Sequence, residues 1–313
     1  MLQTRRSFGR IAAAGAVGLP LLAKPDPNFG GLSVGINAPY SFRGMPGGAG
    51  DILKYLKELG LTSVELRSQP IEGALGAPSV ATRRGGGQQT PEQQEAARAA
   101  AEALEKWRLS APMAQFREFR KKWNDAGIDI EIVKFDAVDR MKDEVVDYAF
   151  NLAKAVGAKA ISCEIPVSKT QWLGELAAKH QFRVGYHGHG DVKNPEAFAT
   201  PESWERSMSF SKYNCINLDI GHFLAGNSTS PIPFLKKYAD RITHIHLKDR
   251  KLNNGPNRPW GEGDTPVREV LQLMKKEKYP FQATIEFEYT VPEGSTVMQE
   301  IARCVSFCRN SVA

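Results

Sequence analysis

The chain has 313 residues, 42% of them hydrophobic, which is enough to bury a large core. Lysine and arginine number 41 against 35 acidic residues, and three of those arginines lie within the first ten residues. So small an excess of positive charge does not indicate a nucleic-acid partner. Four cysteines do not make a disulfide framework in a chain of this length, so the fold should not need an oxidising compartment.

The N-terminal segment resembles a twin-arginine export signal. Arg5 and Arg6 are followed by Phe8 and then by an apolar run over 11–22, which is short for a membrane span. We expect 1–23 to be an export signal and 24–30 a Pro-rich linker, although Leu21 is large for a cleavage site after Ala23. The protein would then be periplasmic or extracellular, without stable membrane insertion once the signal is removed.

Strand-like and helix-like segments alternate through the rest of the chain. The spacing predicts strands at 32–37, 62–67, 128–135, 160–165, 182–187, 215–220, from 242 onward, and at 282–288. It predicts helices at 51–59, 113–126, 143–156, 170–180, 201–211, 233–238, 266–276 and 296–308. This α/β alternation, without a glycine-rich nucleotide-binding motif, predicts a (β/α)8 TIM barrel as a single domain over 31–311.

An insertion interrupts the alternation after the second strand. Residues 68–89 are rich in Gly, Pro, Ser and Arg, which predicts an extended loop, and Thr90-Pro91 opens an alanine-rich helix. Long loops are either functional or disordered, so the insertion is either a lid over the active site or a loop without a function. The sequence leaves both interpretations open.

The strand that begins at 242 carries unusual chemistry. Side chains alternate between faces along a strand, so Ile245 and Leu247 share one face, while His246 and Lys248 share the other. Buried charge is costly unless it is paired or binds a metal. This strand should therefore end in a polar site.

Neighbouring strands end in the same kind of residue. Asp219, His246 and Glu286 come from three successive strands. Together they supply two oxygen ligands and one nitrogen ligand, which suit a divalent ion such as Mn, Co or Zn. The fourth ligand should come from an earlier strand, where His187 is the favoured candidate and Glu164 the alternative. Active sites of such barrels lie at the carboxyl ends of the strands, so we expect a divalent metal ion there.

Further candidates surround this set. His189 should point into the cavity of His187, and Lys248 could polarise a carbonyl or hold an oxyanion, so both are candidate catalytic residues. The candidates for substrate binding are His222, Glu65, Arg67 and Trp260. Glu65 and Arg67 could instead pair with each other, and Trp260 could form either a wall for a sugar ring or part of a plain glycine-rich connection. His244 should be a hydrogen-bonded group behind the ligands.

Four motifs give the chain a resemblance to a known family. They are Asp219-Ile220-Gly221-His222, His244-Ile245-His246-Leu247-Lys248-Asp249, Gly261-Glu262-Gly263 and Glu286 on the last strand. With them the chain resembles the xylose isomerase-like TIM barrel superfamily, also described as sugar phosphate isomerases/epimerases. The resemblance implies metal ligands of Glu, Asp, His and Glu on strands five to eight. Three match, and His187 stands in place of the first glutamate, which the family's epimerases use as one of two opposed acid and base groups.

We therefore expect a metal-dependent isomerase or epimerase that acts on a sugar or sugar-derived ketone. Glu286 or Glu164 would move the proton next to a metal-bound carbonyl. The first alternative is a lyase or dehydratase for keto-sugars, 3-keto-glycosides or keto-cyclitols. The second is a non-catalytic exported sugar-binding barrel, which the fold alone does not exclude. The expected partner is a small carbohydrate, and a homo-oligomer stays open.

Overall fold

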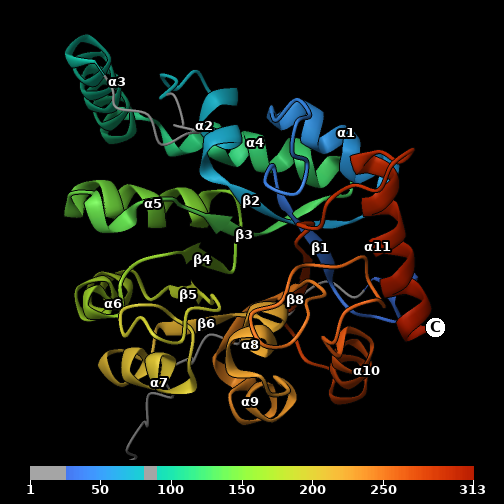
Figure 1. The fold of residues 1–313 in the computed structure, drawn as a ribbon. Helices are drawn as coiled ribbons and strands as arrows, with labels where there is room; N and C mark the ends of the chain where they lie inside the picture. Colours follow the sequence, from blue (N-terminus) through green and yellow to red (C-terminus); the bar gives the residue numbers. More distant parts are fainter. Residues whose placement is uncertain (1–25, 81–89) are drawn as a thin grey trace, which may run out of the picture.

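A closed barrel of eight parallel strands forms the centre of the computed structural model, which describes residues 26–80 and 90–313 (Figure 1). Each strand pairs with the next along the chain, and β8 pairs with β1. The strands are β1 Val34–Ala38, β2 Ser63–Arg67, β3 Asp129–Lys134, β4 Ala160–Cys163, β5 Arg183–His187, β6 Asn214–Asp219, β7 Ile242–Leu247 and β8 Gln282–Ile285. The predicted TIM barrel is confirmed.

Helices surround the strands (Figure 1). They are α1 Ala49–Leu59, α4 Met113–Asp125, α5 Asp143–Ala155, α6 Thr170–His180, α7 Pro201–Phe210, α8 Ile220–Asn227, α9 Ile232–Lys237, α10 Val267–Glu277 and α11 Val297–Val312. The sequence predicted one helix between β6 and β7 at 233–238, and the structure adds α8, which starts at the residue where the sixth strand was expected to end. Among the residues described, no helix is both long and apolar enough to cross a membrane.

The apolar spacing of the helices explains how they attach to the barrel. In α1 the buried residues Ile52, Tyr55, Leu56 and Leu59 recur at intervals of three and four, so they form one stripe that faces the strands. The helix ends at Gly60, whose φ of 66° is left-handed and whose N–H satisfies the last carbonyl groups. Sequence and structure agree on this helix end.

The segment before β1 is packed against the barrel. Residues 26–30, predicted as the end of a linker, contain a short turn at Pro27–Phe29, and the Phe29 side chain is fully buried. The Thr62 hydroxyl donates to the Asp26 carboxylate at 2.7 Å, which ties this turn to the start of β2. The predicted export signal at 1–23 lies outside the described residues and stays a prediction.

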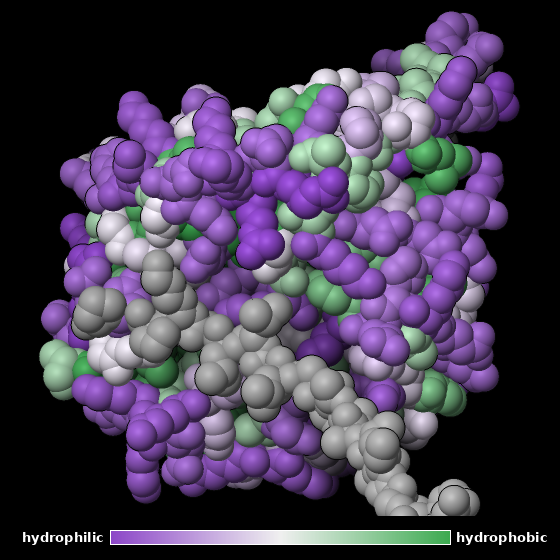
Figure 2. Space-filling model, turned by 180° about the vertical axis from the view of Figure 1, so that it is seen from behind, coloured by the Kyte–Doolittle hydropathy of each residue, from purple (hydrophilic) through white to green (hydrophobic). Residues whose placement is uncertain are grey.

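The insertion after β2 begins with a helix, α2 Ser68–Ala74, so the loop prediction is wrong for these residues. Residues 81–89 lie outside the described part of the chain. The next helix, α3 Pro91–Ser110, starts as predicted: Thr90 and Gln93 exchange backbone and side-chain hydrogen bonds in a capping box. None of its residues is buried, and it projects from the barrel as an arm, which is seen from behind in Figure 2.

A buried ion pair anchors this arm. Arg108 near the end of α3 donates to both carboxylate oxygens of Glu72 in α2, at 2.7 and 3.0 Å. The Tyr148 hydroxyl of α5 donates to the same carboxylate at 3.1 Å. The Glu72 side chain is only 2% exposed, so its charge depends on these two partners.

We expect Arg108→Ala to lower the free energy of unfolding by about 2–4 kcal/mol, because it leaves the Glu72 carboxylate buried without its cation. Urea unfolding followed by circular dichroism measures the change. Arg98→Ala is the matched control on the same helix, since Arg98 pairs with Glu102 at 3.9 Å on the exposed surface and its loss should change little. Equal effects of the two substitutions would contradict the anchoring role.

Candidate metal centre and active site

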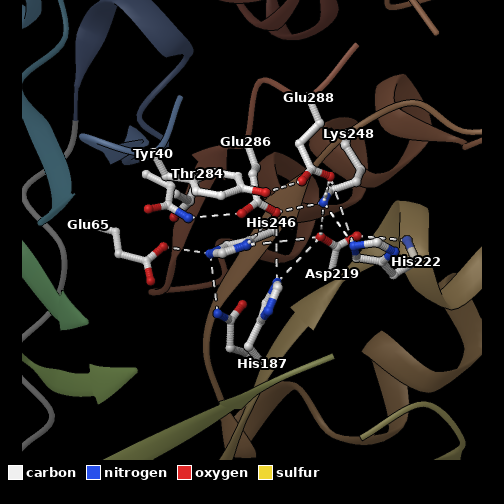
Figure 3. A network of polar contacts seen from close by, with 12 residues as sticks. Tyr40, Glu65, His187, Asp219, His222, His246, Lys248, Thr284, Glu286 and Glu288 are labelled. Carbon is white, nitrogen blue, oxygen red and sulfur yellow. Dashed lines mark hydrogen bonds and ion pairs between the residues drawn. The ribbon is translucent and has the colours of Figure 1, made fainter. Parts of the chain in front are cut away.

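Four buried side chains converge at the carboxyl ends of β5 to β8 (Figure 3). His187 and Asp219 are the last residues of β5 and β6, His246 lies on β7, and Glu286 directly follows β8. Asp219 and His246 are register partners, so the β6 and β7 side chains start from neighbouring positions. These are the four residues that the sequence proposed as metal ligands.

The four donor atoms are spaced as ligands of one ion would be. His187 Nε2 lies 3.5 Å from Asp219 Oδ2 and 3.8 Å from Glu286 Oε2. His246 Nδ1 lies 3.1 Å from Glu286 Oε2 and 4.0 Å from Asp219 Oδ2. Ligands bound about 2.1 Å from an ion at the corners of a tetrahedron stand about 3.4 Å apart.

Unsatisfied polar atoms support the same conclusion. Among the described residues, Asp219 Oδ2 and both ring nitrogens of His187 are buried and lack a well-oriented hydrogen bond. Buried polar atoms are rarely left in this state. Two carboxylates and two imidazoles that face a common point form a donor set for a divalent transition metal, so the residues fit such an ion.

The Lys248 ammonium group lies beside the four donors. Its Nζ is 3.0 Å from Asp219 Oδ2 and 2.7 Å from Glu286 Oε2, and it also contacts Glu288. Burial by itself would raise the pKa values of the Asp219 and Glu286 carboxyls, but the charge of Lys248 holds both below their usual range. Lys248 is 2% exposed, so this lysine at a strand end is buried among the acids and is not solvated.

Glu288 is a site residue that the sequence reasoning missed. It lies two residues beyond Glu286, on the same face of the extended chain, and it contacts Lys248, Tyr40 and Arg43. The period of two along 282–288 could have revealed it. Tyr40 comes from the loop after β1, where no periodic pattern in the sequence predicts which way a side chain points. Burial, together with hydrogen bonding to Glu288, raises the pKa of Tyr40.

His246 is held between two carboxylates. Its Nδ1 faces Glu286, and its Nε2 lies 2.5 Å from Glu65 Oε2 on β2. Burial by itself would lower the pKa of His246, but the charges of Glu65 and Glu286 raise it to about 10 in the metal-free protein. Burial lowers the pKa of His244 to about 4, and this ring lies behind His246, as predicted, 3.5 Å from the other Glu65 oxygen.

A second group of polar residues forms the mouth of the site. Glu164 follows β4, is 45% exposed, and lies 3.2 Å from His187 Nδ1 and 3.2 Å from His189 Nε2. The buried Lys134 on β3 donates to the same carboxylate at 2.5 Å. His189 is 44% exposed and packs edge-on against His187, so it points into the same cavity, as predicted.

His222 lies in the first turn of α8, and not in a loop. The Asp219 carboxylate caps this helix by accepting the His222 N–H at 2.7 Å. The ring nitrogens of His222 lie 3.1 Å from Lys248 Nζ and 2.6 Å from Arg250 Nη1. Burial and the neighbouring cations lower its pKa to about 3, so the ring is neutral at physiological pH.

Glycine at position 221 makes room for Lys248. A Cβ atom there would lie 2.4 Å from Lys248 Cγ and 2.9 Å from the Lys248 carbonyl oxygen. The Lys248 side chain therefore packs directly against the backbone of α8, and any side chain at position 221 would collide with it.

Three motif residues have other partners. Arg67 does not pair with Glu65: its Nη1 donates to both carboxylate oxygens of Asp136, at 2.8 and 2.7 Å. Trp260 packs edge-on against Phe307 of α11, at 5.7 Å between ring centroids, and no contact found among the described residues links it to the four donors. Asp249 accepts the backbone N–H groups of Gly261, Gly263 and Thr265, so it fixes the glycine-rich loop after β7.

Comparisons with known proteins agree with this fold. An inosose dehydratase from Clostridium botulinum is 32% identical over 138 residues, which are 43% of this chain and 39% of that protein, so the match spans about two fifths of the relative. The crystal structure of a probable 3-DHS dehydratase from Bacillus anthracis has a TM-score of 0.60 at 14% identity and covers 88% of this chain and 99% of its own. A zinc-bound IolI protein has a TM-score of 0.58 at 13% identity, covering 90% and 98%.

A family model covers most of the barrel. The model described as xylose isomerase-like TIM barrel matches residues 53–306, which include β2 to β8 and all four donor residues. The sequence motifs, the closed barrel and this match lead to the same assignment. The chain belongs to the xylose isomerase-like TIM barrel family.

Proposed function

We propose that the protein is a metal-dependent lyase that removes water from a keto-cyclitol or keto-sugar. The proposal rests on one arrangement: a half-exposed pair, Glu164 and His189, lies at the mouth beside four buried metal-ligand candidates. The sequence favoured an isomerase or epimerase and held the lyase as the alternative. The arrangement of the acid and base groups favours the opposite order.

His187, Asp219, His246 and Glu286 would hold the metal. When bound, a divalent cation supplies a Lewis acid that polarises a substrate carbonyl or hydroxyl pair. The zinc-bound IolI structure supports a divalent ion of this kind, and two imidazole ligands favour Zn, Co or Mn over Mg.

Glu164 and His189 would move the protons. The Glu164 carboxylate takes the proton on the carbon next to the carbonyl, and the electron pair of that C–H bond forms a C=C bond. The C–O bond on the neighbouring carbon breaks, and the departing hydroxyl takes a proton from His189, so that water leaves. Glu164 then returns its proton to His189, 3.2 Å away, which restores the starting state.

Among the described residues, the opposite side of the site has no acid and base pair as exposed as Glu164 and His189, since the Glu288 and Glu286 side chains are 13% and 3% exposed. Glu288 is held by Lys248, Tyr40 and Arg43, and Glu286 accepts from the Asn37 amide at 2.9 Å and contacts Lys248. Epimerisation needs a second group to return the proton to the other face of the substrate. Carboxylates that are this deeply buried suit binding of substrate hydroxyl groups better than this second proton transfer.

The names of related proteins support the same order. The curated relative from Clostridium botulinum is named an inosose dehydratase, and inosose is a keto-cyclitol. The structure from Bacillus anthracis is described as a probable 3-DHS dehydratase. Both names describe removal of water.

We expect His187→Ala to lower the metal content of the purified protein sharply, because it removes one of four ligands. Glu164→Gln should retain the metal and slow turnover by about 10²-fold or more, the usual contribution of a general base. Plasma mass spectrometry and steady-state kinetics measure the two effects. Glu205→Gln is the matched control, a similarly exposed carboxylate on α7 that pairs with Lys237, and it should change neither. Metal lost from the Glu164 variant and kept in the His187 variant would return Glu164 to the metal shell.

Product analysis separates the three functions. The protein is incubated with keto-cyclitols, ketoses and 3-keto-glycosides in deuterated water, and products are followed by NMR. A lyase gives an unsaturated ketone or its tautomer with loss of water, whereas an isomerase or epimerase gives a rearranged sugar that carries solvent deuterium and retains all its oxygen. Chelation of the metal should stop turnover. Ligand binding without turnover that survives both chelation and Glu286→Gln would instead support a sugar-binding barrel.

A further inference from the structure

Glu65 is a fully buried carboxylate whose role is not explained by substrate binding. It lies on β2, and its side chain reaches His246 on β7 (Figure 3). Neither Glu65 nor His246 has any solvent-exposed surface. A substrate that enters at the mouth therefore meets Glu164 and His189 and does not reach Glu65, which argues against its predicted role in substrate binding.

The contact between Glu65 and His246 determines which ring nitrogen carries a proton. Glu65 Oε2 lies 2.5 Å from His246 Nε2, and an ionised carboxylate can only accept a hydrogen bond. The Asn217 amide nitrogen also lies 3.2 Å from Nε2, but it is a neutral donor at the longer distance, so the shorter contact with the charged carboxylate determines the position of the proton. Glu286 lies 3.1 Å from the other nitrogen, so the shorter Glu65 contact holds its proton more strongly. When the ring gives up one proton, Nε2 therefore keeps the other and the lone pair is on Nδ1.

The lone pair on Nδ1 then faces the other donors. Nδ1 lies 3.1 Å from Glu286 Oε2 and 4.0 Å from Asp219 Oδ2, and His187 Nε2 lies 3.8 and 3.5 Å from the same two oxygens. A lone pair next to two carboxylates is unfavourable unless a cation lies between them. The same tautomer that satisfies Glu65 thus presents His246 to the proposed metal.

Glu65 also lies close to a second histidine. Its second oxygen lies 3.5 Å from His244 Nε2, and the Thr243 hydroxyl lies 2.9 Å from the opposite nitrogen of that ring. Thr243, His244, Glu65 and His246 form one chain of polar contacts that ends at the four donors. Among the described residues, the Glu65 carboxylate forms ion-pair contacts with these two histidines and with no lysine or arginine.

We propose that Glu65 is a positioning residue that makes His246 bind the metal through Nδ1. This inference rests on the metal centre proposed above and adds to it a ligating atom and a supporting carboxylate. Carboxylates that hold the outer nitrogen of a metal-bound histidine orient the ring and raise its basicity, and their loss usually weakens metal binding by about 10–100-fold.

The ligating atom can be observed directly. The wild-type protein is labelled with ¹⁵N histidine and loaded with Zn²⁺, and long-range ¹H–¹⁵N correlation spectra identify which ring nitrogen carries the proton. We expect His246 to show a proton on Nε2 and zinc on Nδ1. Zinc on Nε2 would overturn the proposal. This measurement does not depend on any variant that could fail to fold.

Metal affinity provides the second test. Competition with a chromophoric chelator should show Zn²⁺ binding to Glu65→Gln about 10–100-fold more weakly than to wild type, with a changed visible spectrum when Co²⁺ replaces zinc. Glu131→Gln is the matched control, because Glu131 is a buried acid that contacts Ser33 and Lys159 and does not contact the donors. Equal zinc affinities for wild type and Glu65→Gln would overturn the role of Glu65 alone, whereas absence of zinc binding to wild type would overturn the metal centre and this inference with it.

Discussion

The ammonium group of Lys248 holds the carboxyl end of the barrel together electrostatically. It contacts Asp219 from β6 and two glutamates that follow β8, and it directly follows β7, which lies between these two neighbours. Several carboxylates buried so close together would repel one another and resist ionisation without a cation among them. A lysine on the middle strand can reach acids from both sides, so the acids on β6 and β8 can stay ionised while buried.

This arrangement also shapes the chemistry that we propose. Asp219 Oδ2 and Glu286 Oε2 face both Lys248 and the position expected for the metal, so part of their negative charge is already compensated. With His187 as a ligand, the donor set has one carboxylate fewer than the set implied by the family resemblance. Both effects leave a bound ion more electron-deficient, and such an ion polarises a carbonyl more strongly.

The sequence predicted those parts of the molecule that follow a simple period. Strands with alternating faces revealed His187, Asp219, His246 and Glu286, because the chemistry of one face repeats every second residue. The helix end at Gly60 and the helix start at Thr90 could also be predicted from the sequence, because local hydrogen bonding determines them. The barrel followed from regular alternation of the two periods.

Contacts between residues far apart in the sequence could not be predicted from periodic patterns. Arg67 pairs with Asp136 across the carboxyl ends of β2 and β3, although the sequence offered the nearby Glu65 as a partner. Trp260 packs on α11, although the sequence suggested a wall for a sugar ring. Helix α8 was missed because it starts directly at the end of a strand, so Ile220 continued the pattern of that strand. Helix α2 was missed because it belongs to a segment whose Gly, Pro and Ser content predicted a loop. The link from Glu65 to His246 joins residues 181 positions apart, and only closure of the barrel brings them together.

The space at Gly221 links two sequence motifs that otherwise look independent. The missing side chain on α8 is the volume through which the Lys248 methylene groups pass, so the Asp-Ile-Gly-His and His-Leu-Lys-Asp segments are complementary surfaces of one packing unit. A methyl group at 221 would displace the lysine that neutralises the acids, and a shorter residue at 248 would leave a void against the helix. Substitutions at these two positions should therefore be strongly non-additive, and any relative that replaces one of them is expected to have changed the other.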